Sequence, residues 1–281
     1  VGGCVMENHS SYAERVEYVV KKVAEHEEWA NENKGQPVDF SNVIFSGVPL
    51  EGANLSSTSL KNCHTFSTKL SEIDFKDSDL SGSVMHDSIC IETDFTRANV
   101  SDVFLNDSLF ILAVLKDANF SKSMLDDSTW KVVAGERVNF NESCLRVSEF
   151  RSCDFRGGNF KEANLYASVF INVDFEGADM SVGFKQHASF IQCNLRNTNF
   201  SGSDLSYSSF YGSDLEGADF TGATLTGVVG NGREIKTVQT GEGMVTSIGT
   251  ISFKAEHPNK QPIVTWEDIA IAEGEEYDFD F

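Results

Sequence analysis

The sequence predicts a solenoid fold, in which one short unit recurs along most of the chain. Two observations support this prediction. Stepping by five from Phe40 to Leu225 visits 38 positions in one register, and only Thr65, Gly135 and Lys185 among them are not apolar. The residue two places before each of these positions is small or β-branched. Neither an α-helix nor a β-strand has a period of five, so each unit is expected to carry one large and one small inward side chain.

The repeat is clearest in four segments, which are ANL at 53–55, ANF at 118–120, ANL at 163–165 and ADF at 218–220. They resemble the pentapeptide-repeat family, whose unit is A(D/N)LXX. The resemblance covers residues 38–227 and implies an all-β solenoid, namely a right-handed quadrilateral β-helix with one pentapeptide per side and four per coil. We therefore expect about nine to ten coils, held together by contacts between neighbouring coils.

Residues 1–37 precede the repeats and are expected to form an N-terminal helical cap. Ser11 and Glu14 have the spacing of a capping box, which predicts a helix over residues 10–33. The apolar face of this helix is formed by Val16, Val19, Val20, Val23 and Trp29. We expect the helix to cover the first coil, because an open solenoid end is an edge that invites aggregation. A partner-binding helix is the alternative.

Residues 228–281 leave the period of five. The stretch 228–266 is expected to form a strand-rich C-terminal cap, with two strands joined by a turn at Gly241 and Gly243. Its segment GNGREIKTVQT also resembles the tails of a bacterial and bacteriophage branch of the family. Residues 267–281 contain seven acids and no base, which predicts an acidic tail that is either mobile or attractive to a basic partner.

The net charge of the chain is −21. Binding to nucleic acid or to an anionic membrane surface requires clustered Lys and Arg, so the charge argues against both and favours a basic protein partner. No apolar run approaches the roughly 18 residues of a membrane span. The six cysteines show no metal-ligand spacing. We expect a cytoplasmic protein with reduced thiols and without a bound metal or cofactor.

The sequence offers no catalytic constellation, and the chain is expected not to be an enzyme. Catalysis requires a nucleophile or base oriented by its neighbours in a pocket, and an interior filled with Phe, Leu and small residues leaves little room for one. Lys185 lies at an inward position. We expect a local bulge there, in which Phe184 turns inward and Lys185 reaches solvent, because burying an unpaired ammonium is very costly. A reactive buried lysine is the alternative.

The same register sorts the outward side chains by side of the solenoid. One side carries an acidic face, formed by Asp74, Asp94, Asp154, Asp174 and Asp214. Two other sides carry an apolar patch, formed by Val84, Ile89, Ile91, Phe104, Leu109, Ile111, Leu112 and Met124. A contiguous exposed apolar patch is typical of an interface. Partner binding or homodimer formation explains it, and cover by the N-terminal helix or the C-terminal tail is the alternative.

The favoured function is therefore a rigid, non-enzymatic protein–protein interaction protein that uses the apolar patch and the acidic faces. The alternative, which the resemblance suggests, is an acidic mimic of B-DNA that binds a DNA-handling enzyme such as DNA gyrase or topoisomerase IV, as quinolone-resistance members of the family do. The charge density of the repeats is well below that of DNA, which carries one charge per about 1.7 Å. Salt distinguishes the two functions, because it weakens binding through an acidic face more steeply than binding through an apolar patch.

Overall fold

The computed structural model describes residues 11–32, 36–230, 233–240 and 243–250. The acidic tail expected at 267–281 lies outside these residues, as does the part of the expected C-terminal cap that follows residue 250.

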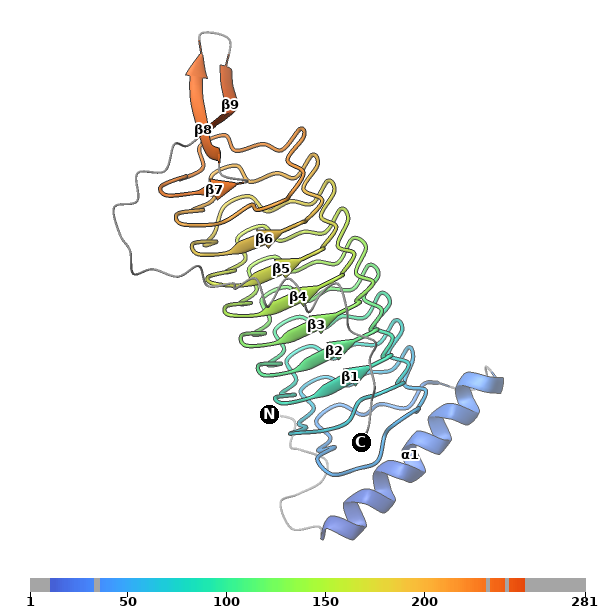
Figure 1. Cartoon of the computed structure of the whole chain (residues 1–281). Helices are drawn as coiled ribbons and strands as arrows, with labels where there is room; N and C mark the ends of the chain where they lie inside the picture. The colour runs from blue at the N-terminus through green and yellow to red at the C-terminus, as the bar shows by residue number, and fades with distance from the viewer. Residues whose placement is uncertain (1–10, 33–35, 231–232, 241–242, 251–281) are drawn as a thin grey trace, which may run out of the picture. The chain divides into compact units, whose positions relative to one another are not determined.

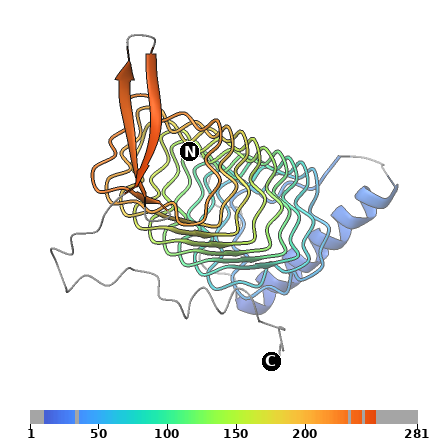
Figure 2. The ribbon, with the colours of Figure 1, turned by 45° about the horizontal axis from the view of Figure 1, so that its top comes forward.

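The repeats form a right-handed quadrilateral β-helix of stacked coils (Figure 1). Parallel bridges join residues that are twenty places apart, from the pair Asp39 and Ser59 to the pair Ser209 and Val229. Twenty residues per coil means four pentapeptides per coil, and this register extends over nine and a half coils. Figure 2 shows the coils following one another with nearly the same outline. The fold class expected from the sequence is confirmed.

Each coil has four sides, which we number in chain order by their bridging residues. Side 1 is marked by Phe104, side 2 by Leu109, side 3 by Asp94 and side 4 by Asn99, each with the residues twenty places before and after it. Side 2 carries a six-stranded parallel sheet. Its strands are β1 (Ile89–Ile91), β2 (Leu109–Ile111), β3 (Thr129–Lys131), β4 (Glu149–Arg151), β5 (Val169–Ile171) and β6 (Ser189–Ile191).

The core consists of the inward residues that the sequence predicts, which form one column on each side of the solenoid. Every inward position from Phe40 to Phe210 is buried, including the three that are not apolar. The inward rings of side 2 form a continuous stack with neighbouring centroids 3.8 to 5.5 Å apart, made by Phe110, Trp130, Phe150, Phe170, Phe190 and Phe210. Gly135 fits its position because the Phe155 ring fills the space, and a Cβ there would lie 2.6 Å from that ring.

Lys185 overturns the expectation of a bulge. Its side chain is fully buried, whereas Phe184 is 58% exposed, so the chain stays in register. Hydrogen bonds to both neighbouring coils hold it there: the Lys185 N–H donates to the Asp204 carbonyl (2.8 Å), and the Leu165 N–H donates to the Phe184 carbonyl (2.7 Å). The Lys185 Nζ donates to the Val182 carbonyl at 2.7 Å. Burial lowers the pKa of this amine to about 7, which makes the neutral form accessible.

Helix α1 (Tyr12–Glu32) begins with the capping box that the sequence predicts. The Ser11 N–H donates to Glu14 Oε2 at 2.7 Å, and the Glu14 N–H donates to Ser11 Oγ at 3.3 Å. These two bonds satisfy backbone donors that the first turn of a helix leaves without intrahelical partners. Val20, expected on the apolar face, is exposed.

Helix α1 is joined to the first coils through His26, which is buried. The His26 Nε2 lies 2.9 Å from the Ser56 carbonyl, and the Val38 N–H donates to His26 Nδ1 at 3.2 Å. In the described residues, hydrogen bonds join α1 to residues 38–56 of the first coils. The helix therefore covers the first coils and not the apolar patch, so the alternative of cover by the N-terminal helix is wrong.

The last described elements form a three-stranded antiparallel sheet. Its strands are β7 (Val229–Gly230), β8 (Arg233–Thr240) and β9 (Gly243–Thr250). The two strands that the sequence predicts after the repeats, β8 and β9, are therefore present.

Candidate protein-interaction surface

The structure brings the eight predicted patch residues onto sides 1 and 2 of neighbouring coils. Bridges link Val84 to Phe104 and Phe104 to Met124 along side 1. Strands β1 and β2 hold the side 2 members Ile89, Ile91, Leu109 and Ile111, with Leu112 in the turn that follows. Phe104 is 40% exposed and Leu112 is 46% exposed, and the other six are partly buried. Below, "apolar patch" means these eight residues.

Further apolar side chains that sequence reasoning missed extend the exposed surface. Phe66 and Phe104 flank His86 on side 1, with ring centroids 6.3 and 6.0 Å from the His86 ring. Val132 is 47% exposed and lies one coil beyond Leu112 at the same turn position. These side chains could have been found from the sequence, because residues twenty places apart form columns at the turn positions as well as at the bridging positions.

Leu112 and Val132 adopt an unfavourable backbone conformation. Their φ angles are 55° and 54°, in the left-handed region that costs an L-residue roughly 1–2 kcal/mol and that β-branched residues rarely adopt. Other coils place glycine or a polar residue at the same turn position, also with positive φ, for example Gly52 (74°), Glu92 (55°) and Gly212 (70°). Local folding therefore favours glycine at these two positions, yet both carry exposed apolar side chains.

A column of three carboxylates runs between the two halves of the patch. Asp87, Asp107 and Asp127 occupy the turn from side 1 to side 2 in three successive coils, and all three are exposed. No salt bridge joins any of them to a cation within the described residues. We call this column the acidic ridge.

The acidic face lies on side 3, where the structure aligns its five aspartates as predicted. Cations that sequence reasoning overlooked accompany them. Lys76 Nζ lies 3.1 Å from an Asp74 oxygen and 3.0 Å from an Asp94 oxygen. The guanidinium of Arg156 pairs with Asp154, and that of Arg196 pairs with Asp214.

The remaining member of the acidic face, Asp174, accepts a hydrogen bond from Asn194 Nδ2 at 3.0 Å. At the next turn Arg97 pairs with Asp77 through a contact of 2.6 Å, and Arg137 pairs with Asp117. Side 3 is therefore a ladder of ion pairs rather than a bare acidic surface. The missed signal is the alternation of acid and base every twenty residues in the columns beside the aspartates.

Side 4 carries a ladder of amides whose role is structural. The Asn119 Nδ2 donates to Asn99 Oδ1 at 3.0 Å, the Asn139 Nδ2 to Asn119 Oδ1 at 2.8 Å, and the Asn159 Nδ2 to Asn139 Oδ1 at 3.0 Å. Each bond links one coil to the next, so the ladder reinforces the backbone bonds between coils.

A second group of exposed aromatic side chains lies on side 1, several coils beyond the patch. The His187 ring is 5.6 Å from that of Tyr166 and 5.2 Å from that of Tyr207. Phe184 projects from the neighbouring bridging position and is exposed. Side 1 and the turn that follows it thus carry two separate groups of exposed aromatic side chains.

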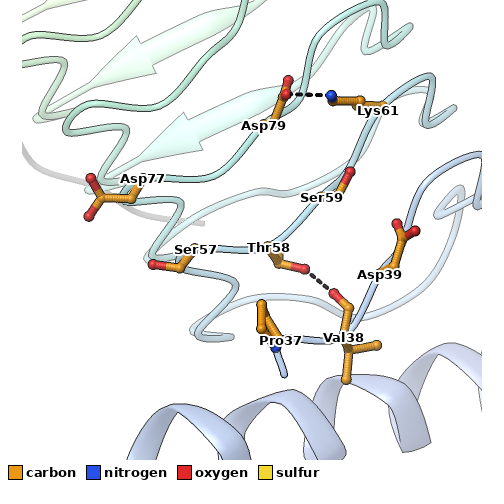
Figure 3. Close-up of a pocket in the computed structure, with 9 residues that line it drawn as sticks. All are labelled: Pro37, Val38, Asp39, Ser57, Thr58, Ser59, Lys61, Asp77 and Asp79. Atoms are coloured by element: carbon orange, nitrogen blue, oxygen red, sulfur yellow. Dashed lines mark hydrogen bonds and ion pairs between the residues drawn. The ribbon is translucent and has the colours of Figure 1, made fainter. Parts of the chain in front are cut away.

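A hollow of about 370 Å³ lies beside the segment that follows α1 (Figure 3). It is lined by Pro37, Val38, Asp39, Ser57, Thr58, Ser59, Lys61, Asp77 and Asp79. The Lys61 amine pairs with Asp79 at 2.9 Å, and the Asp77 carboxylate pairs with Arg97 outside the hollow. The Asp39 carboxylate accepts from the Ser41 N–H at 2.8 Å. Among the lining residues, no nucleophile is paired with a base.

The other reactive groups of the described core are enclosed. Burial raises the pKa of the Cys153 and Cys193 thiols to about 12, so neither forms a thiolate near neutral pH. Across the described part of the chain, no group of three His, Cys, Asp or Glu side chains is arranged to hold a metal ion. A search of the same residues also finds no helix with the length and hydropathy needed to cross a membrane.

Comparisons with known proteins agree with the fold. The family model described as pentapeptide repeats (8 copies) matches residues 93–129, and the model described as pentapeptide repeat region matches residues 143–220. A search of curated protein sequences finds no match.

The chain is similar to several solved structures of pentapeptide repeat proteins, HetL and QnrB1 among them. HetL, a pentapeptide repeat protein involved in heterocyst differentiation regulation from the cyanobacterium Nostoc sp. strain PCC 7120, is 19% identical, with 74% of this chain and 95% of HetL covered and a TM-score of 0.49. QnrB1, a plasmid-mediated fluoroquinolone resistance protein, is 22% identical, with 58% of this chain and 90% of QnrB1 covered and a TM-score of 0.38. With TM-scores below 0.5, neither indicates what this chain binds. The coil register and the two family models together show that the chain belongs to the pentapeptide-repeat family.

Proposed function

We propose that this protein is a rigid, non-enzymatic scaffold that binds a protein partner through the apolar patch. The observation that carries the proposal is the pair Leu112 and Val132, which expose apolar side chains from a left-handed backbone position, as Val147 and Val182 do elsewhere, and which lie beside the other exposed apolar residues of the patch. Residues of this type lower the stability of the free protein at that position, and strain of this kind is concentrated at functional sites. These two side chains do not stabilise the fold of the free protein, and burial by a partner would explain why they are present.

The hydrogen bonds under the patch support a rigid scaffold. The Phe104 N–H donates to the Ser83 carbonyl at 3.0 Å, and the Leu105 N–H donates to the Met124 carbonyl at 2.7 Å. The patch is thus fixed to the coil before it and to the coil after it. A surface that is already ordered loses little conformational entropy on binding, which favours affinity.

The B-DNA mimic is the second candidate, and it draws on the net charge of −21. The ion pairs of side 3 argue against that side as the mimicking surface, because four of its five aspartates are bonded to Lys76, Arg156 or Arg196. A DNA gyrase supercoiling assay in the presence of a quinolone tests this candidate. Protection of the enzyme at low salt supports the mimic, and unchanged inhibition argues for the scaffold.

Charge substitutions in the patch test the scaffold. We expect Phe104→Asp and Leu109→Asp each to weaken partner binding or self-association about tenfold or more, because a buried unpaired carboxylate is costly at an interface. Leu112→Asn serves as a third variant, since Asn tolerates the left-handed backbone better than Leu does. Ser121→Asp, in the turn from side 4 to side 1 and outside the patch, is the matched control and should bind as the wild type does.

Binding is measured by photo-crosslinking from position 111 in cells, which no variant changes, and by sedimentation velocity for self-association. Circular dichroism establishes that each variant retains its fold. The proposal is wrong if the patch variants bind as well as Ser121→Asp does. It is also wrong if Phe104→Asp and Leu109→Asp unfold the protein while Ser121→Asp does not, because the patch is then an internal interface.

A further inference from the structure

We propose that the partner segment that binds the apolar patch is a cationic amphipathic helix lying along the solenoid axis, over the turn between sides 1 and 2. This inference rests on the proposed function and assigns the chemistry of the partner. The juxtaposition that points to it is the acidic ridge, which runs between the side 1 and side 2 halves of the patch.

The charges of the ridge favour a basic partner. Asp87, Asp107 and Asp127 stack in successive coils, whose backbones are about 4.8 Å apart, and like charges at this distance repel one another. At the equivalent turn of side 3 the chain alternates the charges instead, and Asp77 pairs with Arg97. Among the described residues, no ion pair joins a cation to Asp87, Asp107 or Asp127, and only Asp127 has a cation nearby, that of Arg146, so cations from a partner would relieve the repulsion.

Asp126, the acid nearest to the ridge, is already paired within the chain. Asp126 is buried and accepts from the Arg146 guanidinium, and its other oxygen accepts from the Arg146 N–H at 2.8 Å. Arg146 is therefore hydrogen-bonded to Asp126, and it also lies near enough to Asp127 for that carboxylate to raise the Arg146 pKa. Within the described part of the chain, the carboxylates without a nearby internal cation at this turn are those of Asp87 and Asp107.

The spacing of the ridge favours a helix over an extended strand. One helical turn rises 5.4 Å, close to the roughly 4.8 Å between coils. Lys or Arg at positions i, i+4 and i+7 of a helix along the axis therefore approach the three carboxylates in turn. In a strand, side chains on one face recur about every 6.6 Å, which falls out of step with the ridge after one coil.

Apolar strips on both sides of the ridge complete the match. Phe104 and Met124 lie on the side 1 flank, and Ile89 and Leu109 lie on the side 2 flank. A helix with a narrow row of cations bordered by apolar residues would place its cations on the ridge and its apolar borders on these strips. The ridge would also set the register, because each coil offers one carboxylate.

The probe for this inference is a fluorescein-labelled synthetic helical peptide with Lys at i, i+4, i+7 and i+11 and Leu beside each Lys. Two peptides of the same length serve as controls, one with the residues shuffled so that no face forms and one with every Lys replaced by Glu. Fluorescence anisotropy with the full chain measures affinity at low and at high salt. We expect only the first peptide to bind, and its affinity to fall as salt rises.

The variant Asp107→Lys should weaken peptide binding about tenfold at low salt. Asp107→Asn, which suits the left-handed backbone, should weaken it less. Glu142→Lys is the matched control, because Glu142 is exposed at the same left-handed turn position on side 4, and it should bind within twofold of the wild type. Equal binding by Asp107→Lys and Glu142→Lys, or equal binding of the shuffled peptide, overturns the inference.

The two proposals can fail separately. If Leu109→Asp abolishes crosslinking to the cellular partner while Asp107→Lys does not weaken it, the patch is an interface but its partner is not a cationic helix. If Leu109→Asp leaves both crosslinking and peptide binding unchanged, the proposed function fails as well.

Discussion

Lys185 shows how the solenoid register overrides the preference of a single residue. An ammonium in an apolar core is strongly disfavoured, yet moving Lys185 outward would break the backbone bonds that hold its coil to both neighbours. The side chain adapts instead. Its amine donates to the Val182 carbonyl, and burial lowers its pKa to about 7.

Replacing Lys185 with Met should stabilise the protein and change its pH dependence. Above pH 7 the folded state holds a neutral amine, whereas the unfolded chain stays charged up to the ordinary pKa of 10.5. The wild type therefore gains stability as pH rises from 7 to 10.5, and its penalty at pH 7 is on the order of 4 kcal/mol. We expect Lys185→Met to recover about 2–4 kcal/mol at pH 7.

Urea unfolding of both proteins at pH 7, 8, 9 and 10 measures this difference. The advantage of Lys185→Met should shrink as pH rises, because the penalty in the wild type disappears. Lys161→Met, which removes an exposed lysine, is the control and should show no such trend. A constant difference between Lys185→Met and the wild type would mean that the amine is charged inside the core.

At the scale of elements, helix α1 is held to the first coils by a titratable group. His26 meets the Ser56 carbonyl through Nε2 and accepts the Val38 N–H through Nδ1, which requires the neutral ring. Burial lowers the pKa of His26, and the Ser56 carbonyl and the charge of Glu27 oppose that shift. The contact therefore contributes stability that is fully present above pH 6.5 and is lost as pH falls below that value.

We expect α1 to loosen from the first coils on mild acidification. Protonation of Nδ1 removes the acceptor for the Val38 N–H, so the hydrogen-exchange protection factor of that amide, which corrects for the intrinsic pH dependence of exchange, should fall below pH 6.5. Trp29 fluorescence reports the same event, since its ring is 5.1 Å from that of His26. His26→Gln should abolish the pH dependence, and His64→Gln, which alters an exposed histidine, should keep it. The same pH profile in the wild type and His26→Gln would contradict this account.

The elements differ in how far the sequence could predict them. The register of five predicted the buried columns, because a repeat reports the same environment many times. The ion pairs of side 3 and the acidic ridge required columns twenty residues apart, and they were missed because only the bridging positions were followed. The docking of His26 had no such signal, since a single histidine on a helix has no periodicity.

At the scale of the whole molecule, each described coil is stabilised mainly by its two neighbours. The backbone bonds, the aromatic stack and the Asn ladder all connect residues about twenty places apart. A solenoid of this kind should tolerate the loss of a complete coil and not the loss of one side, because only the former preserves every column.

Two deletions test this prediction directly. One removes residues 153–172, and the other removes residues 168–172. The first deletion takes out one coil, joins Phe150 to Phe190 in the aromatic stack and removes the paired Asp154 and Arg156 together. We expect it to retain the β-helix and to bind the partner as the full chain does, since the patch lies in other coils. The second deletion removes Phe170 and shifts every later side by one, which breaks the aromatic stack. We expect it to lower the urea midpoint well below that of the first deletion, and equal midpoints would show that the columns do not determine the stability of the solenoid.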